Sequence, residues 1–346
     1  MQRFWLYSLI AAAGGFAVIH LLPKFDRNLD REYVRSLIDS QASSFPLEGK
    51  TAVVTGSTSG LGQAIATELY GLGATVYVVG RTPSKLTKVS EDIVASSSAS
   101  PGKVVVERLD TSDLNSVRDF SDKIQVNLGE DGKVDYLVNN AGIHHASTPS
   151  ASGAASAQGF DMAFATNYLG HFLLTELMIP IMPDGGRVVQ IASSMHMTSD
   201  GSMLRVPEGE GAMPLAAKAG VQDDGWHEEA AYGNNKLAQI LHAKELQRRL
   251  DRKGSGVKIV SVCPNWVNTG ILPDDIGGRL VASLAFNTAA GTIGALYSLF
   301  SSSIKGGEYV SNSRLILLEF TNPSKLQRLS KKVRHHIVLS LSMVVL

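Results

Sequence analysis

Short apolar runs rich in β-branched residues alternate with helical patterns over most of this chain of 346 residues. The runs lie at Thr51–Thr55, Thr75–Val79, Val104–Arg108, Val134–Val138, Arg187–Ile191 and Val257–Val262. Nearly continuous Val/Ile runs separated by helices are typical of a parallel sheet that is buried on both faces. The pattern therefore predicts an α/β fold with a doubly wound, Rossmann-like parallel sheet.

A different hydrophobic pattern occupies the N-terminus. The stretch from Trp5 to Leu22 carries no Lys, Arg, Asp or Glu. As a helix it would span about 27 Å at ~1.5 Å per residue, close to the ~30 Å hydrocarbon core of a bilayer. We expect a retained transmembrane helix. A cleaved signal peptide and a hydrophobic hairpin of the kind found on lipid droplets remain alternatives.

The basic residues around this segment predict its orientation. Arg3 precedes it, and the residues that follow include Lys24, Arg27, Arg31 and Arg35. Because Lys and Arg are retained on the cytosolic side, we expect the main domain to face the cytosol.

The whole chain is expected to divide into four parts. We expect a membrane anchor at 1–24, a linker at 25–46, one α/β domain at 47–335 and an apolar tail at 336–346. A basic stretch precedes the tail, so the tail either contacts a membrane surface or packs on a neighbouring subunit.

Three stretches inside the domain depart from the regular alternation. Ser147–Gly159 is small and polar, and Met197–Ala230 is a glycine-containing insertion long enough to suggest a lid. Val281–Phe300 has no charge, but polar residues interrupt it, and we expect a buried helix and a substrate lobe rather than a second membrane span.

Composition excludes several classes of protein. Hydrophobic residues make up 44% of the chain and charged residues 18%, which excludes a disordered or fibrous protein. Lys+Arg and Asp+Glu both number 32, so the basic excess of a nucleic-acid binder is missing. Cys263 is the single cysteine, which excludes an internal disulfide and a cysteine-only zinc site, and we expect no metal.

A glycine-rich turn follows the first predicted strand and opens a helix that continues through Gln63–Gly71. Glycines there permit a tight turn and close approach of a diphosphate to the backbone, while the helix N-terminus faces the negative charge. A structural strand–helix turn is the alternative. In this position we expect a nucleotide site formed by Gly56, Ser57, Ser59, Gly60, Leu61 and Gly62.

The end of the second strand predicts which dinucleotide binds. An NAD site normally carries an acid about 20 residues after the turn, for the ribose hydroxyls. Gly80 occupies that place here, and Arg81 follows it. Because an arginine can pair with a 2′-phosphate, we expect NADP(H) rather than NAD(H), with Lys85 as a second candidate cation.

Tyr232 and Lys236 lie four residues apart at the start of a predicted helix, and therefore on one helical face. A tyrosine with a pKa near ~10 is a poor base at neutral pH. A nearby ammonium stabilises the phenolate, so we expect Lys236 to lower the pKa of Tyr232.

Together these motifs resemble the short-chain dehydrogenase/reductase superfamily over roughly residues 50–330. The matching elements are TGSTSGLG at 55–62, Asp110-Thr111, Asn139-Asn140-Ala141-Gly142, Asn167, Ser193 and YGNNK at 232–236. The stretches 167–175 and 231–249 are similar to the retinol-dehydrogenase and WW-domain-oxidoreductase branch, many of whose members are membrane-anchored.

The resemblance implies a role for each matching residue. Tyr232 would be the acid or base, Lys236 would bind the nicotinamide ribose, Ser193 (rather than Ser194) would hydrogen-bond the substrate oxygen, and Asn167 would hold a water in a proton relay. Further cofactor contacts are implied for Asp110 at the adenine and for Thr111, Asn139, Ala141, Gly142, Pro264, Val267 and Thr269, with Thr269 at the carboxamide.

Two departures from the family pattern stand out. Asn265 follows Pro264 where the family usually has glycine, and 39 positions separate Ser193 from Tyr232, more than the family's usual gap.

His144 either lines the active site or fills the edge of the pocket. We expect Cys263 to be a small buried residue.

The expected function is therefore an NADP(H)-dependent oxidoreductase that interconverts a lipophilic alcohol with its aldehyde or ketone, such as a retinoid, steroid, polyprenol or long-chain carbonyl. It would be a single-pass protein of the endoplasmic reticulum or lipid droplet. A homo-oligomer is common in the family but stays open here. The alternatives are a catalytically silent, NADPH-binding redox sensor at a membrane and an enzyme like light-dependent protochlorophyllide reductase.

Overall fold

The computed structural model describes residues 46–97, 100–144, 154–199, 201–206, 228–264, 267, 288–311 and 316–317. The predicted anchor, nearly all of the linker, the apolar tail, Thr269 and the greater part of the Met197–Ala230 insertion lie outside these ranges. No helix within the described ranges is long and apolar enough to cross a membrane.

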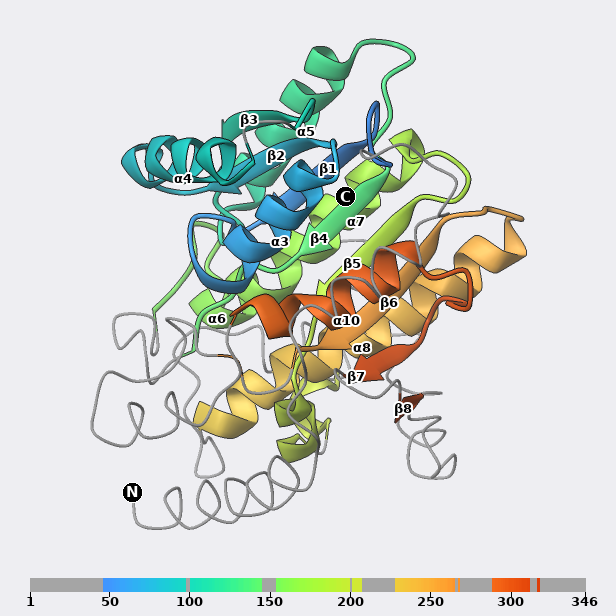
Figure 1. Ribbon diagram of the computed structural model, residues 1–346. Helices are drawn as coiled ribbons and strands as arrows, with labels where there is room; N and C mark the ends of the chain where they lie inside the picture. The colour runs from blue at the N-terminus through green and yellow to red at the C-terminus, as the bar shows by residue number, and fades with distance from the viewer. Residues whose placement is uncertain are drawn as a thin grey trace, which may run out of the picture.

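One twisted sheet forms the centre of the domain (Figure 1). Its order is β3-β2-β1-β4-β5-β6-β7-β8, and every neighbouring pair is parallel except β7 with β8. The strands are β1 (Thr51–Thr55), β2 (Thr75–Gly80), β3 (Lys103–Arg108), β4 (Tyr136–Asn139), β5 (Arg187–Ile191), β6 (Lys258–Cys263), β7 (Tyr309–Ser311) and β8 (Ile316–Leu317). The prediction of a doubly wound parallel sheet is confirmed.

Helices cover both faces of this sheet. One layer consists of α3 (Gly60–Gly71), α4 (Pro83–Ser96) and α10 (Thr288–Phe300), and the other of α5 (Leu114–Leu128), α7 (Gly170–Met178) and α8 (Glu228–Arg252). Successive strand residues face opposite layers, so Val53 packs with α5, α7 and α8, whereas Ala52 and Val54 pack with α3, α4 and α10. This double burial explains the continuous apolar runs in the sequence.

Short helical turns connect the larger elements. They are α6 (Met162–Phe164), the π-helical turn η3 (Ala165–Leu169), and the 3₁₀ turns η4 (Ile179–Ile181), η5 (Ser194–Thr198) and η6 (Ser202–Leu204). The end of η5 and all of η6 belong to the start of the predicted insertion.

The strand boundaries differ from the predicted runs mainly at β4. Val134 was expected in the strand, but its N–H donates to the Ile181 carbonyl 3.2 Å away, outside the sheet, and β4 begins at Tyr136. The predicted buried helix at 281–300 is confirmed for Thr288–Phe300, where Ala295 and Leu296 are buried.

The order of the strands also determines where a ligand can bind. The chain first builds outward from β1 to β2 and β3, then returns to place β4 on the other side of β1. Ligands of doubly wound folds bind at the carboxyl ends of the strands where the order reverses. That point is the turn after β1 and the loop after β4.

Candidate active site

The turn after β1 is shaped by glycines. Gly56 and Gly60 have φ of 63° and 58°, in the region that favours glycine. A Cβ on Gly56 would lie 2.8 Å from the Ala141 Cα, and one on Gly62 would lie 2.5 Å from the Gly56 carbonyl oxygen and also meet the Asn140 amide. The glycines therefore let the turn pack closely against itself and against the loop after β4, where a side chain would clash.

The helix that follows presents its N-terminus at this turn. Ser59, the N-cap residue of α3, makes no side-chain capping hydrogen bond, and the first turn contains no acidic residue. The amide groups and the positive end of the helix dipole thus remain available for an anion. Glycines and helix end together fit the diphosphate of a dinucleotide.

The end of β2 fits the adenosine side of an NADP-type ligand. A Cβ on Gly80 would lie 2.8 Å from the Thr58 methyl carbon, so there is little room for the carboxylate that an NAD site carries here. Arg81, the next residue, is exposed. Ser57 also has a structural role, because its buried hydroxyl accepts from the Val79 amide at 2.9 Å.

The loop after β4 is bound to the phosphate turn by Thr55. The Thr55 Oγ1 accepts hydrogen bonds from the amides of Asn140 at 2.8 Å and Ala141 at 2.9 Å. The Asn140 side-chain amide donates to the Thr55 carbonyl at 2.9 Å. Further along the loop, the Ile143 amide donates to the Asn167 Oδ1 at 2.8 Å, and the Asn167 Nδ2 donates to the Ile143 carbonyl at 2.9 Å.

Some residues of the predicted cofactor set also make contacts within the protein. The Asn139 side chain is fully buried and donates to the Thr175 hydroxyl of α7 at 2.8 Å. The Asp110 carboxylate accepts from the Ser112 amide and hydroxyl at 3.0 and 2.7 Å. The sequence pattern does not distinguish such structural contacts from ligand contacts.

Tyr232 and Lys236 lie together on α8, as their spacing predicted. The Lys236 Nζ is 5.4 Å from the centre of the Tyr232 ring, and both side chains are buried. Lys236 donates to the Ile191 carbonyl at 2.7 Å, at the end of β5. This bond fixes the ammonium beside the carboxyl edge of the sheet.

Burial dominates the electrostatics of this pair. It lowers the pKa of Lys236 to about 8, and it raises the pKa of Tyr232 well above its ordinary value. The sequence argument expected Lys236 to lower the pKa of Tyr232. The protein without cofactor shows the opposite direction, because loss of solvation disfavours the phenolate.

Ser193 is placed next to this helix by a close helix–turn contact. It is the N-cap of η5, and its Oγ accepts from the Met195 amide at 3.2 Å. A Cβ on Gly233 would lie 2.7 Å from the Met195 carbonyl oxygen, so only glycine lets α8 approach η5 this closely. His196 donates from Nδ1 to the Ser193 carbonyl at 2.7 Å and holds the backbone of the turn.

Other expected residues surround the pair. The centre of the His144 ring lies 4.7 Å from the centre of the Tyr232 ring. Cys263 is buried as predicted. Val267 is buried and lies close to Gly291 of α10. Pro264 directly follows the end of β6, and Thr269 lies outside the described residues.

Two residues at the site were not found from the sequence. The Gln239 side chain donates to the Asn167 carbonyl at 2.8 Å, linking α8 to η3. His171 donates to the same carbonyl from Nδ1 at 3.1 Å. Gln239 lies one helical turn beyond Lys236, and His171 lies one helical turn beyond Asn167. This spacing was the signal in the sequence that could have identified them as site residues.

Known proteins resemble this chain in sequence and structure. The profile of the family described as short chain dehydrogenase matches residues 50–204. Retinol dehydrogenase 11 of Homo sapiens is 33% identical over 261 residues, covering 74% of this chain and 74% of the relative. Polyprenol dehydrogenase of Danio rerio is 30% identical over 284 residues, covering 77% and 79%.

The alignments with other retinol dehydrogenases span between 61% and 79% of those proteins' lengths. In structure, a short chain dehydrogenase from Burkholderia cenocepacia J2315 in complex with NADP superposes with a TM-score of 0.58 at 22% identity, covering 77% of this chain and 97% of that one. This likeness supports the fold. On the sequence matches, this chain belongs to the short-chain dehydrogenase family, in its retinol-dehydrogenase-like branch.

Proposed function

We propose that this protein is a membrane-associated, NADP(H)-dependent oxidoreductase that interconverts a lipophilic alcohol and its aldehyde or ketone. One observation carries the proposal: Tyr232 and Lys236 lie buried, one helical turn apart, at the same sheet edge as a glycine-lined phosphate turn. A proton donor and a dinucleotide site at one edge are what hydride transfer to a carbonyl requires.

The choice of NADP(H) rests on the end of β2. Arg81 is exposed there and positioned to pair with a 2′-phosphate, and the contact between Gly80 and Thr58 disfavours an acidic side chain. The NADP complex of the Burkholderia relative agrees with this choice. When bound, the cofactor would supply or accept the hydride.

The residues of the chain would carry the proton. Tyr232 would donate its phenolic proton to the substrate oxygen in reduction and recover it in oxidation. Burial keeps Tyr232 protonated before reaction, which is the state an acid needs. The Lys236 ammonium over the ring would stabilise the phenolate that remains, and the Ser193 hydroxyl would hydrogen-bond the substrate oxygen.

The lipophilic substrate class rests on the relatives and on the N-terminal sequence. A retinol dehydrogenase and a polyprenol dehydrogenase act on apolar alcohols, as their names state. The apolar segment Trp5–Leu22 would bring the domain to the membrane in which such substrates dissolve. We propose the endoplasmic reticulum or lipid droplet, with the domain facing the cytosol.

The first test is turnover by the full chain in detergent on a panel of lipophilic aldehydes and ketones, with NADPH and NADH compared. We expect NADPH-dependent turnover that Tyr232→Phe abolishes. Tight NADPH binding without turnover of any panel member would favour the silent redox sensor.

Protease treatment of sealed vesicles tests the orientation separately. We expect a protease added outside microsomes to cleave the domain, since the outside of these vesicles corresponds to the cytosol. Protection of the domain would contradict the orientation.

A further inference from the structure

His171 is a fully buried titratable side chain that the catalytic steps above do not use. It lies on the first turn of α7, and the Thr55, Asn167 and His171 side chains all have 0% exposure. Burying an imidazole costs free energy unless both nitrogens have partners. Its partners therefore indicate what the residue does.

The two nitrogens of His171 have different partners, and these determine its tautomer. Nδ1 lies 3.1 Å from the Asn167 carbonyl oxygen, which can only accept, so Nδ1 carries the proton. Nε2 then accepts, and it lies 2.8 Å from the Thr55 hydroxyl. The Thr55 oxygen already accepts two backbone N–H groups, and the nearer acceptor for its own proton is the His171 Nε2, since the Val138 carbonyl is 3.4 Å away.

These bonds complete a closed ring of contacts around the loop after β4. Thr55 holds the amides of Asn140 and Ala141 at one end of the loop. Asn167 holds the backbone of Ile143 at the other end. His171 joins Thr55 to Asn167 and thereby connects the two supports.

The position of this loop matters for a cofactor because it packs directly on the phosphate turn. A Cβ added to Gly56 would lie only 2.8 Å from the Ala141 Cα. The same ring also reaches the catalytic helix, since Gln239 of α8 donates to the Asn167 carbonyl. A shift of the loop would change both the cofactor site and its distance from α8.

We propose that His171 is a positioning residue for the cofactor: its neutral imidazole joins Thr55 to Asn167 and holds the loop Asn140–Ile143 against the phosphate turn. The inference rests on the proposed NADP(H) function. Burial, opposed by the bond to Asn167 and reinforced by the Lys236 charge, lowers the pKa of His171 to about 4, which keeps the ring in the required neutral state.

Three substitutions at His171 separate its two bonds. His171→Leu removes both. His171→Asn keeps a donor near the Asn167 carbonyl but loses the acceptor for Thr55. His171→Gln keeps an acceptor that reaches toward Thr55. Thr55→Val removes the same bond from the other side and also removes the acceptor of the Asn140 and Ala141 amides, whereas Thr55→Ser retains all of these bonds.

The matched control is Ser298→Ala. Ser298 has another fully buried hydroxyl, on α10, and its bond to the Gly294 carbonyl at 2.8 Å lies outside the ring. If burial damage alone were responsible, this control would weaken cofactor binding as much as Thr55→Val does.

The measurements are the Kd for NADPH, the Tm, and the hydrogen-exchange rates of the Asn140 and Ala141 amides in the cofactor-free full chain. We expect His171→Leu to raise the Kd about tenfold, as for the loss of a buried hydrogen bond, and Thr55→Val to raise it at least as much. The double variant should add little to Thr55→Val. Amide exchange should accelerate in both, and His171→Gln should recover more than His171→Asn.

A purely structural role gives a different result. A lower Tm in His171→Leu, with the Kd within about twofold of wild type and unchanged amide exchange, would overturn the proposal. So would an equal rise of Kd in Ser298→Ala.

The exchange data also separate this inference from the proposed function. If the wild-type chain failed to bind NADPH, the proposed cofactor would be wrong. Faster exchange at Asn140 and Ala141 in His171→Leu, restored in His171→Gln, would still support the positioning role, and unchanged exchange would still overturn it.

Discussion

The two halves of the proposed active site are formed by different kinds of groups. The cofactor half, between β1 and β4, is made of backbone groups and of glycines such as Gly56 and Gly62, which leave no room for added atoms. The catalytic half, between β5 and α8, is made of buried side chains, chiefly Tyr232 and Lys236. The difference implies that adding an atom damages the first half, whereas removing one damages the second.

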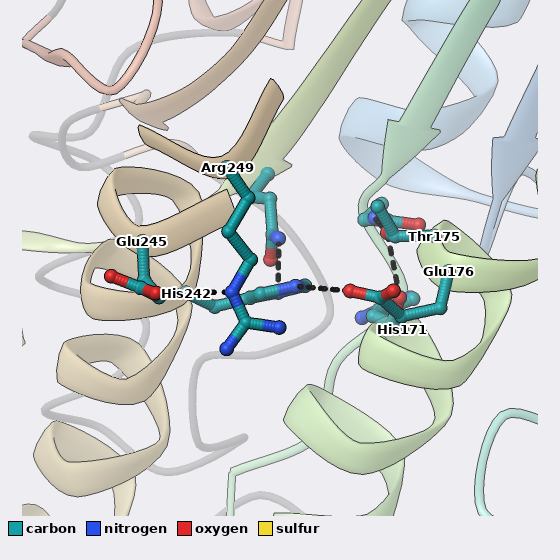
Figure 2. A network of polar contacts seen from close by, with 8 residues as sticks. His171, Thr175, Glu176, His242, Glu245 and Arg249 are labelled. Atoms are coloured by element: carbon teal, nitrogen blue, oxygen red, sulfur yellow. Dashed lines mark hydrogen bonds and ion pairs between the residues drawn. The ribbon is translucent and has the colours of Figure 1, made fainter. Parts of the chain in front are cut away.

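The buried histidines of the two halves show the same contrast. His171 has only neutral partners, Thr55 and Asn167. His242 of α8 accepts from the Gln190 amide at 2.9 Å, and its other nitrogen faces the Glu176 carboxylate at 3.8 Å (Figure 2). Although burial acts to raise the pKa of Glu176, His242 and nearby cations lower it overall. The cluster around His242 thus contains charged side chains, whereas both hydrogen-bond partners of His171 are neutral.

Removing one atom from the catalytic half should have the largest effect. Tyr232→Phe deletes the hydroxyl proposed as acid and base, and we expect turnover to fall by about 10²–10⁴-fold. The Kd for NADPH should stay within about twofold, since the cofactor half is untouched. Steady-state rates and a nicotinamide fluorescence titration measure the two quantities.

The control for this prediction is Tyr168→Phe. Tyr168 is also fully buried, and its hydroxyl has no hydrogen-bond partner among the described residues. Its turnover should match that of wild type. Comparable losses in both variants would contradict the role of Tyr232.

Adding one methyl group to the cofactor half should have the next largest effect. Gly62→Ala would place a Cβ 2.5 Å from the Gly56 carbonyl oxygen, and relieving such overlap costs about 1–3 kcal/mol. We expect the Kd for NADPH to rise by roughly 10–100-fold, and titration of the purified variant measures it.

Gly71→Ala is the control in the same helix, because a Cβ there meets nothing within 4 Å. Its NADPH affinity should be unchanged and its stability equal or slightly higher, since alanine favours helix more than glycine does. If Gly62→Ala also bound NADPH normally, the assignment of the phosphate turn would be wrong.

Removing a charge at the edge of the cofactor half should have a smaller, selective effect. Arg81→Ala should weaken NADPH binding about tenfold and leave NADH binding unchanged, because only NADPH carries the 2′-phosphate. Lys88→Ala, an exposed cation on α4, should change neither. Equal catalytic efficiency of the wild type with both cofactors would refute the preference for NADP(H).

The same contrast explains what the sequence could predict. Burial on both faces leaves a continuous apolar run, so β1 and β5 were predicted to the residue. The glycines of the phosphate turn and the Tyr232–Lys236 spacing are local patterns. The start of β4 was missed because a distant carbonyl, that of Ile181, takes the Val134 amide.

The role of His171 and the pKa of Tyr232 could not be predicted in this way. The Thr55 partner of His171 is 116 residues away, and the tautomer of the ring depends on which groups meet it in three dimensions. The upward shift of the pKa of Tyr232 depends on burial, which residue spacing does not report.

The smallest predicted effect concerns the neutral histidine itself. Because the pKa of His171 falls from an ordinary value near 6.5 to about 4 on folding, the unfolded chain binds more protons between these values. Stability should therefore decrease as the pH falls. From about pH 7.5 to about pH 6, His171 should contribute a loss of about 1 kcal/mol in the free energy of unfolding.

Urea unfolding of wild type and His171→Gln at both pH values isolates this contribution, because the other histidines titrate in both proteins. We expect the wild type to lose about 1 kcal/mol more than the variant over this interval. Equal losses would mean that His171 titrates normally in the folded state. Such a ring would be in contact with water or with an acidic group. The contrast between the neutral surroundings of His171 and the charged surroundings of His242 would then not hold.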